Sequence, residues 1–294
     1  MAADISAAKA QHAPHAPSVR FEHLTKTYPG GSRRPATIAV EDVTLSIPAG
    51  SLTVLVGSSG SGKTTLLRTV NRMVTPTSGR VLIDDNDIAG LDAVKLRRTI
   101  GYVMQESGLL PHRKVIDNIA TVPRLNGVKK APAHERAYEL MDLVGLDHQL
   151  AARYPAELSG GQQQRVGVAR ALAASPRLLL MDEPFGAVDP IVRADLQREV
   201  RRLQYQLGIT ILFVTHDIAE ALTLGDKIVV LAQKGRIAQQ GTGAELLTRP
   251  ADDFVANFLG LDAGRGLHLM NSDGVQLVMD ADERPIGRLS GPGR

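Results

Sequence analysis

Apolar runs along the chain predict buried strands that alternate with amphipathic helices. Residues 178–181 and 209–214 are short and continuously apolar, which indicates strands covered on both faces of a parallel sheet. Residues 190–206, between these two runs, have the apolar spacing of an amphipathic helix. Helical spacing also occupies much of residues 111–174. This order predicts an α/β fold in which a helical insertion precedes a βαβ unit.

The first third of the chain has strand patterns that end at a glycine-rich segment. Residues 19–24 and 39–47 are typical of strands, and residues 51–56 form a third apolar run. After the glycine-rich residues 57–62, residues 63–74 have a helical pattern. A strand, a glycine-rich loop and a helix in this order predict a phosphate-binding arrangement.

Composition narrows the class of protein. The chain has 294 residues, of which 43% are hydrophobic, enough for a sizeable core, and Lys plus Arg number 34 against 31 Asp plus Glu. This near balance does not indicate the basic face of a nucleic-acid groove, so we expect no nucleic-acid partner. No apolar run approaches the roughly 18 residues of a membrane span. The absence of cysteine excludes disulfides and thiolate metal sites and is compatible with a reducing cytosol.

The N-terminal segment has a composition of its own. Residues 1–18 are rich in Ala, His and Pro and contain no apolar core of the kind found in signal peptides. We therefore expect a disordered N-terminal extension.

The glycine-rich segment fits the phosphate-loop pattern G-x4-G-K-[ST]. Its residues are Gly57, Ser58, Ser59, Gly60, Ser61, Gly62, Lys63 and Thr64. Glycines let backbone N–H groups converge on phosphates at the positive end of the following helix. The Lys63 ammonium adds charge there, and the Thr64 hydroxyl suits Mg²⁺. An ordinary Gly/Ser turn is the alternative, and the strand before and helix after the loop count against it.

Two acids follow the apolar run at residues 178–181. In a phosphate-loop enzyme the strand beside the loop delivers an acid to the Mg²⁺ shell, and Asp182 has that position. The next residue, Glu183, can act as general base on the attacking water. Taken alone, the pair could be an acidic turn before Pro184. The phosphate loop favours the catalytic interpretation.

A second glycine-rich turn opens another helix. It consists of Leu158, Ser159, Gly160, Gly161 and Gln162. Free N–H groups at a helix start suit a phosphate. Because Lys63 already serves the single γ-phosphate of one nucleotide, a second cradle implies that two chains share each ATP. By spacing alone, a serine N-cap followed by a glycine turn is the better interpretation.

Together these motifs resemble, in order, those of the ABC transporter ATPase family over about residues 19–260. The family's motifs correspond to the phosphate loop through Thr65, the Q-loop Gln105, the signature 158–162, the Walker B acids Asp182 and Glu183, the D-loop Ala187, Val188 and Asp189, and the switch His216. The resemblance implies a P-loop NTPase cassette with a RecA-like core, an N-terminal antiparallel β subdomain and a helical subdomain carrying the signature. It also implies ATP and Mg²⁺ as cofactors, and a homodimer in which residues 159–162 of one chain close on the ATP held by the other.

Single residues receive roles from the same resemblance. Tyr28, before Pro29 and Gly30, is expected to stack on adenine, with a simple turn tyrosine as the alternative. His216 is expected to contact the γ-phosphate and Gln105 to sense Mg²⁺ and water, although alone they could be a surface histidine and a polar strand end. The implied catalytic residues are Lys63, Glu183 and His216, and the implied Mg²⁺ contacts are Thr64, Gln105 and Asp182.

Three stretches, residues 71–79, 108–123 and 184–193, are similar to ATPases of osmoprotectant importers for glycine betaine, choline, carnitine or proline. This resemblance implies two transmembrane permease subunits contacted between Gln105 and Ser159, a substrate-binding protein acting through them, and a location at the cytoplasmic face of the cell membrane. The alternatives are an importer for amino acids such as methionine or for inorganic anions, and a soluble ABC ATPase of DNA repair or translation.

Residues 261–294 form a short C-terminal tail. Many ATPases of this branch carry paired CBS modules after the cassette, and residues 275–287 resemble a strand–turn–strand piece of one. The tail is too short for a whole module. We expect a truncated CBS-like remnant or a dimer contact, with a hairpin or loose tail as the alternative.

Overall fold

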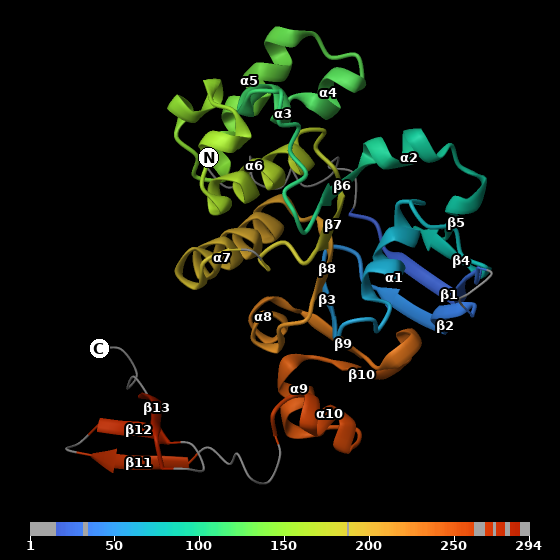
Figure 1. The fold of residues 1–294 in the computed structure, drawn as a ribbon, viewed down its shortest axis with the longest axis vertical. Coiled ribbons are helices and arrows are strands. Elements are labelled where there is room, and N and C mark those ends of the chain that lie inside the picture. Colours follow the sequence, from blue (N-terminus) through green and yellow to red (C-terminus); the bar gives the residue numbers. More distant parts are fainter. Residues whose placement is uncertain are drawn as a thin grey trace, which may run out of the picture.

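A six-stranded sheet lies at the centre of the computed structural model, which describes residues 16–31, 35–186, 188–261, 268–272, 275–279 and 283–288 (Figure 1). The strand order is β10-β9-β3-β8-β7-β6, and every neighbouring pair except β10–β9 is parallel. The strands are β3 (Leu52–Gly57), β6 (Ile100–Val103), β7 (Leu178–Asp182), β8 (Thr210–Thr215), β9 (Lys227–Leu231) and β10 (Ile237–Gly241). Strands β3, β7 and β8 are buried throughout. The continuous apolar runs thus correspond to parallel strands covered on both faces, as predicted.

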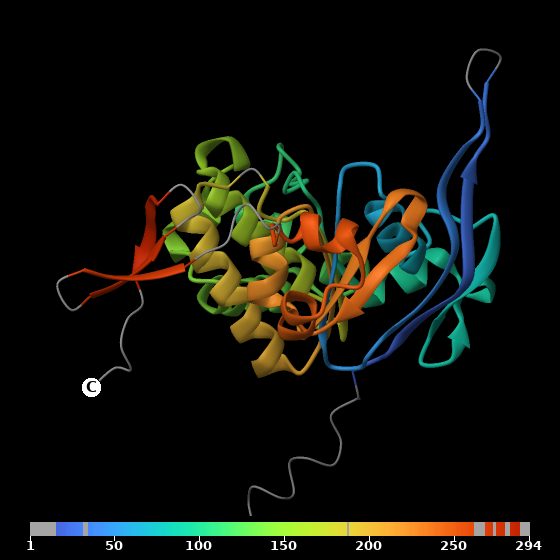
Figure 2. The same ribbon diagram turned by 90° about the horizontal axis from the view of Figure 1, so that it is seen from below.

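Four other strands from the N-terminal third form a second, antiparallel sheet with the order β2-β1-β4-β5. Its strands are β1 (Val19–Tyr28), β2 (Thr37–Ile47), β4 (Ser78–Ile83) and β5 (Asn86–Asp87). Strands β1 and β2 form a long ribbon that projects beyond the rest of the fold (Figure 2). At the base of the ribbon, Phe21 and Leu45 are buried against Leu66 of the following helix. This sheet is the predicted N-terminal β subdomain.

Helices fall into two groups. The helical subdomain, green in Figure 1, contains α3 (Val115–Ile119), α4 (Thr121–Leu125), α5 (Lys130–Leu143), η2 (His148–Ala152), η3 (Pro155–Glu157) and α6 (Gly160–Leu172). The remaining helices are α1 (Lys63–Val70), η1 (Ile88–Gly90), α2 (Ala93–Thr99), α7 (Pro190–Leu207), α8 (Ile218–Leu224), η4 (Gln233–Gly235), α9 (Gly243–Thr248) and α10 (Asp253–Phe258). In the described part of the chain, every helix is too short or too polar to cross a bilayer.

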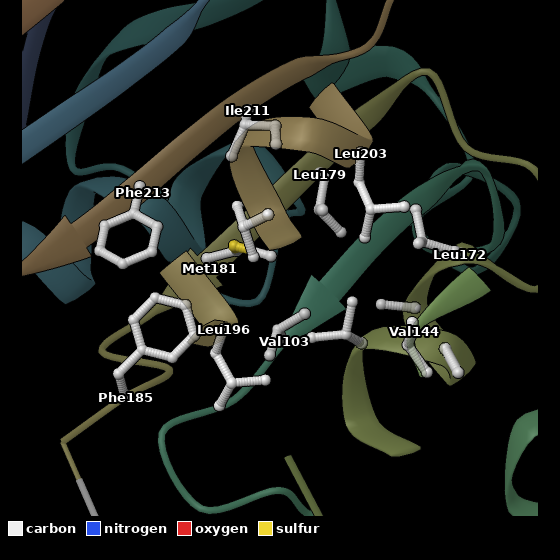
Figure 3. Close-up of a cluster of buried hydrophobic side chains, with 14 of the residues drawn as sticks. Val103, Val144, Leu172, Leu179, Met181, Phe185, Leu196, Leu203, Ile211 and Phe213 are labelled. Carbon is white, nitrogen blue, oxygen red and sulfur yellow. The ribbon is translucent and has the colours of Figure 1, made fainter. Parts of the chain in front are cut away.

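The larger hydrophobic core lies between the central sheet and helices α6 and α7 (Figure 3). Met181 of β7 and Phe213 of β8 contribute from the sheet, and Leu196 of α7 contributes from the helix. The ring centroids of Phe185 and Phe213 lie 5.6 Å apart in a tilted arrangement, a favourable geometry for aromatic pairs. This packing fixes the carboxyl ends of β7 and β8, where the polar site residues begin.

Helix α1 ends at Val70, so the helix predicted over residues 63–74 is wrong at its C-terminal end. Arg72 has a φ of +55°, in the left-handed region that ends a helix. The Val74 N–H then donates to the Arg68 carbonyl at 3.0 Å, and the Arg72 N–H donates to the Thr69 carbonyl at 3.1 Å. These bonds satisfy the carbonyls of Arg68 and Thr69 at the end of the helix. The sequence does not indicate this turn, because it contains no glycine.

The two ends of the chain are only partly described. The predicted disorder over residues 1–18 falls mostly on residues 1–15, which lie outside the described residues. Pro17 and Ser18 are held, because Thr210 Oγ1 donates to the Pro17 carbonyl at 2.6 Å and the Ser18 N–H donates to Asp84 Oδ1 at 2.8 Å.

Near the C-terminus, β11 (His268–Ser272), β12 (Val275–Met279) and β13 (Pro285–Arg288) form an antiparallel sheet. The strand–turn–strand pattern predicted over residues 275–287 corresponds to β12 and β13. Its interpretation as a CBS-like remnant stays a prediction.

Candidate active site

The phosphate loop connects β3 to α1 and depends on two left-handed glycines. Gly60 has a φ of +77° and Gly62 a φ of +93°, conformations that glycine adopts without steric cost. A Cβ at Gly62 would lie 2.5 Å from the Ala39 carbonyl oxygen, and one at Gly57 would lie 2.4 Å from the Leu231 carbonyl oxygen. The loop is therefore packed tightly against β2 and β9, and its backbone is exposed to an approaching phosphate, which fits the predicted nucleotide.

Lys63 lies at the centre of this loop and is buried. Its Nζ donates to the carbonyl oxygens of Gly57 at 2.7 Å and Ser58 at 2.9 Å. Burial lowers the pKa of Lys63, and the nearby carboxylates of Glu183 and Asp182 act in the opposite direction. The fold thus holds an ammonium group inside the phosphate loop.

Thr64 and Asp182 meet beside the loop. Thr64 Oγ1 donates to Asp182 Oδ1 at 2.8 Å, although one belongs to α1 and the other ends β7. A hydroxyl and a carboxylate are oxygen ligands of the type Mg²⁺ prefers. No group of three or more His, Cys, Asp or Glu side chains suited to a metal gathers within the described ranges. The residues present fit a Mg²⁺ ion that depends on nucleotide phosphates for further ligands.

Two further residues contact Asp182, and the sequence motifs predicted neither of them. The Tyr102 hydroxyl donates to Asp182 Oδ2 at 3.0 Å, and an Arg68 guanidinium nitrogen donates to the same oxygen at 3.3 Å. Burial raises the pKa of Tyr102 to about 12, so its hydroxyl keeps its proton at neutral pH. Arg68 lies one helical turn after Thr64, so the two side chains share a face of α1. This spacing could have placed Arg68 near the site from the sequence alone. Tyr102 could be found only from the pairing of β6 with β7.

Glu183, His216 and Gln105, which follow three different strands, lie together. His216 Nδ1 lies 2.9 Å from Glu183 Oε2, and Gln105 Nε2 lies 3.5 Å from the same oxygen, at the limit of a hydrogen bond. Glu183 has a φ of +46° and its N–H donates to the Val214 carbonyl at 2.9 Å. A left-handed non-glycine residue costs on the order of 1–3 kcal/mol and is often found at functional sites. The structure thus assembles the predicted base, switch and sensor, and their roles stay predictions.

The cavity beside the phosphate loop has a volume of 550 Å³, which lies within the range of about 300–1,000 Å³ that is typical of small-molecule sites. Its lining includes Tyr28, Lys63, Thr64, Thr65, Gln105 and Glu183. Tyr28 is 41% exposed, and Lys26 Nζ lies 5.1 Å from its ring centroid. The aromatic ring predicted to stack on adenine therefore shares one cavity with the residues predicted to bind phosphate.

The signature residues 159–162 begin helix α6 away from this cavity. Ser159 Oγ accepts from the Gln162 N–H at 3.3 Å, and Gln162 Oε1 accepts from the Ser159 N–H at 2.9 Å. This capping box confirms the N-cap interpretation of the serine. Residues 159–162 do not line the cavity beside the phosphate loop, whereas Gly160 lines a second one together with Gln105. A phosphate contact by the signature stays a prediction that needs a second chain.

The predicted D-loop is only partly described. Ala187 lies outside the described residues. Val188 is buried, and its carbonyl accepts from an Arg193 guanidinium nitrogen at 3.2 Å. Arg193 also lies 3.6 Å from Asp217, next to the switch histidine, so the segment after β7 is tied to the segment after β8.

The sequence also matches known proteins. The family described as ABC transporter matches residues 40–186. The carnitine transport ATP-binding protein OpuCA of Listeria monocytogenes is 51% identical over 83% of this chain, and the chain spans 60% of that protein's length. The glycine betaine uptake system ATP-binding protein YehX of Escherichia coli is 46% identical over 92% of this chain and 85% of its own length.

Among solved structures, a dimeric ATP-binding cassette in a post-hydrolysis state with ADP and phosphate is 33% identical with a TM-score of 0.68, covering 76% of this chain and 98% of that one. The cassette fold that the motifs predicted is thereby confirmed. With the family match and these relatives, the chain belongs to the ABC transporter family.

Proposed function

We propose that this chain is the ATP-binding and ATP-hydrolysing subunit of an importer that takes up an osmoprotectant of the glycine betaine, choline, carnitine or proline type. The observation that carries this proposal is the 46% identity to a glycine betaine uptake ATP-binding protein, matched over 85% of that protein's length. The 51% identity to a carnitine transport ATP-binding protein supports the same class of cargo. Both relatives are named for small quaternary amines.

Hydrolysis would be carried out by groups at the ends of β3, β7 and β8. The Lys63 ammonium, held by loop carbonyls, stabilises negative charge on the phosphates. Glu183 accepts a proton from the attacking water, and His216, 2.9 Å away through Nδ1, orients that carboxylate. The other ring nitrogen of His216 is the atom that would reach the γ-phosphate.

Mg²⁺ would be held beside these groups. When bound with the nucleotide, it supplies positive charge to the phosphate oxygens. Thr64 and Asp182 are the residues that would hold it, with Gln105 at the edge of the same cavity. Tyr28 lines that cavity and would carry the adenine ring.

A complete site would need a second copy of the chain. The signature residues 159–162 do not line the cavity beside the phosphate loop of their own chain. Two copies arranged head to tail would place each signature on the nucleotide held by the partner. The surface between Gln105 and Ser159 would contact two permease subunits at the cytoplasmic face of the membrane, and a substrate-binding protein would deliver cargo to the permease.

Uptake in a strain that lacks this chain tests the cargo. Labelled glycine betaine, choline, carnitine and proline would be compared with labelled methionine and phosphate, after complementation with the wild-type chain or with Glu183→Gln. We expect uptake of at least one osmoprotectant to be lost on deletion and restored by the wild-type chain but not by Glu183→Gln. Normal osmoprotectant uptake in the deletion strain, with loss of methionine or phosphate uptake, would instead assign the chain to another importer.

A further inference from the structure

The two carboxylate oxygens of Asp182 have different environments. Oδ1 accepts from the Thr64 hydroxyl at 2.8 Å. Oδ2 accepts from the Tyr102 hydroxyl at 3.0 Å and from Arg68 at 3.3 Å. The Asp182 residue is only 3% exposed, so these side chains rather than water determine how the group is held. One oxygen therefore meets Thr64, which is also a predicted Mg²⁺ contact, and the other receives the hydrogen bonds from Tyr102 and Arg68.

This asymmetry matters because a carboxylate is otherwise free to turn. The last torsion of an aspartate is broad and nearly two-fold, so rotation exchanges the two oxygens at little cost. Donors on one oxygen remove this freedom. Metal ligands in proteins are commonly oriented in this way by groups that do not touch the metal.

We propose that Tyr102, with Arg68, is a positioning residue that fixes the Asp182 carboxylate so that Oδ1 is presented beside the Thr64 hydroxyl to Mg²⁺. This inference rests on the proposed function, in which Asp182 serves a Mg²⁺–nucleotide complex. Tyr102 does not touch the metal or the nucleotide in this scheme. It acts through the orientation of Asp182 alone.

Two neighbouring strands and the phosphate-loop helix carry the three residues. Tyr102 lies on β6 and pairs in register with Leu180 of β7, two positions before Asp182. Arg68 lies on α1, and its Nε donates to the Tyr102 hydroxyl oxygen at 3.3 Å. The hydroxyl therefore receives one hydrogen bond and donates another. The phosphate-loop helix and two neighbouring strands are joined at the one acid predicted to serve the metal.

Tyr102 and Arg68 differ in charge, so substitutions of the two residues test different effects. The Arg68 guanidinium compensates the buried charge of Asp182, but it also repels a nearby dication. Tyr102 is neutral, so Tyr102→Phe removes the hydrogen bond to Asp182 and the one from Arg68 but leaves the charge of the site unchanged. This substitution therefore tests positioning without a change in electrostatics.

If Tyr102 had a purely structural role, its removal would have a different effect from the one that positioning predicts. If the hydroxyl only stabilises a buried carboxylate, its loss lowers the unfolding temperature and leaves the metal affinity of the folded protein unchanged. If it positions Asp182, metal affinity falls in protein that is still folded. The two roles are separated by measuring metal binding directly.

The experiment uses Mn²⁺ as a spectroscopic probe of the Mg²⁺ site. Mn²⁺ is titrated into the full chain saturated with a non-hydrolysable ATP analogue, and free Mn²⁺ is followed by electron paramagnetic resonance. Loss of an outer hydrogen-bond partner commonly weakens metal binding about 10- to 100-fold, and we expect Tyr102→Phe to raise the Mn²⁺ Kd about tenfold. The affinity for the analogue in EDTA should be unchanged. Tyr205→Phe is the matched control, because Tyr205 is 86% exposed on α7.

A second variant keeps the proposal testable if Tyr102→Phe folds poorly. Arg68→Gln removes a positive charge near the metal, so simple electrostatics predicts tighter Mn²⁺ binding, whereas positioning predicts weaker binding. A Mn²⁺ Kd within twofold of wild type in folded Tyr102→Phe, or tighter binding in Arg68→Gln, would overturn the proposal. Failure of the ATP-binding part of the proposed function, on which this inference rests, looks different, because the wild-type chain itself would then bind neither the analogue nor Mn²⁺ with it.

Discussion

Glu183 Oε2 and His216 Nδ1 lie 2.9 Å apart although 33 residues separate them in the chain. Asp182 of β7 is in register with Val214 of β8, so the residues just beyond these parallel strands emerge side by side. Glu183 has a left-handed backbone, with a φ of +46°, and its carboxylate meets the histidine. The contact results from strand register, and it brings the predicted base to the predicted γ-phosphate switch.

Glu183→Gln should lower ATP turnover about 10²–10⁴-fold, the usual contribution of a general base. Nucleotide binding should remain, because Lys63 and Thr64 are unchanged, and the variant should accumulate an ATP-loaded dimer. Steady-state phosphate release and size-exclusion chromatography with ATP would measure the two effects. Glu135→Gln, an exposed position on α5, is the control. Normal turnover in Glu183→Gln would remove the base role from this residue.

Lys63→Ala should abolish most nucleotide binding, because the buried ammonium is the charge held inside the phosphate loop. A ligand at about 100 times its Kd stabilises a protein by about 2.7 kcal/mol. Thermal unfolding with and without Mg²⁺-ATP should therefore show a clear shift in wild type and in the exposed Lys130→Ala control. The shift should be lost in Lys63→Ala. An undiminished shift would contradict the assignment of the loop.

Tyr28→Ala should weaken ATP binding through loss of a stacking surface. Stacking of a base on an aromatic ring contributes about 1–3 kcal/mol, which corresponds to about five- to 150-fold in Kd. Binding of inorganic tripolyphosphate, which has no base, should be unaffected, and Tyr28→Phe should bind ATP like wild type. If ATP and tripolyphosphate weakened equally, Tyr28 would be a turn residue and not a base platform.

Gly62→Ala should destabilise the fold more than Gly60→Ala does. Both glycines have positive φ, so both variants incur backbone strain of on the order of 1–3 kcal/mol. At Gly62 the new Cβ would also lie 2.5 Å from the Ala39 carbonyl oxygen, whereas no atom lies within 4 Å of a Cβ at Gly60. Denaturant unfolding of the nucleotide-free variants isolates the cost of this close approach. Equal losses would show that the loop can move away from β2.

The sequence predicts the features of this fold that depend on local pattern. Continuous apolar runs predict the buried strands β7 and β8. The spacing of the glycines, Lys63 and Thr64 predicts the phosphate loop. Interactions that depend on pairing were not predictable in this way. Tyr102 reaches Asp182 only because β6 and β7 pair with Tyr102 opposite Leu180. A single sequence carries no direct signal of that register.

The remaining differences have local causes. The end of α1 at Val70 was missed because a left-handed arginine, Arg72, ends the helix where a glycine usually does. Short helices such as α2 and α8 begin at aspartate N-caps, Asp92 and Asp217, but at seven residues each they are too short to give a periodic signal. The role of the signature serine cannot be tested in one chain. Its capping box lies within this chain, whereas the phosphate that it is predicted to contact would be bound by a second copy.

The central claim is that two chains share each ATP, and a crosslink tests it most directly. The chain contains no cysteine, so Ser59→Cys and Ser159→Cys can each be introduced alone into Glu183→Gln chains that carry different affinity tags. The mixed chains are treated with a short thiol crosslinker with and without Mg²⁺-ATP. The account predicts a covalent dimer carrying both tags that forms only with ATP, and none from either variant alone. ATP binding without any crosslink between differently tagged chains would contradict the shared site.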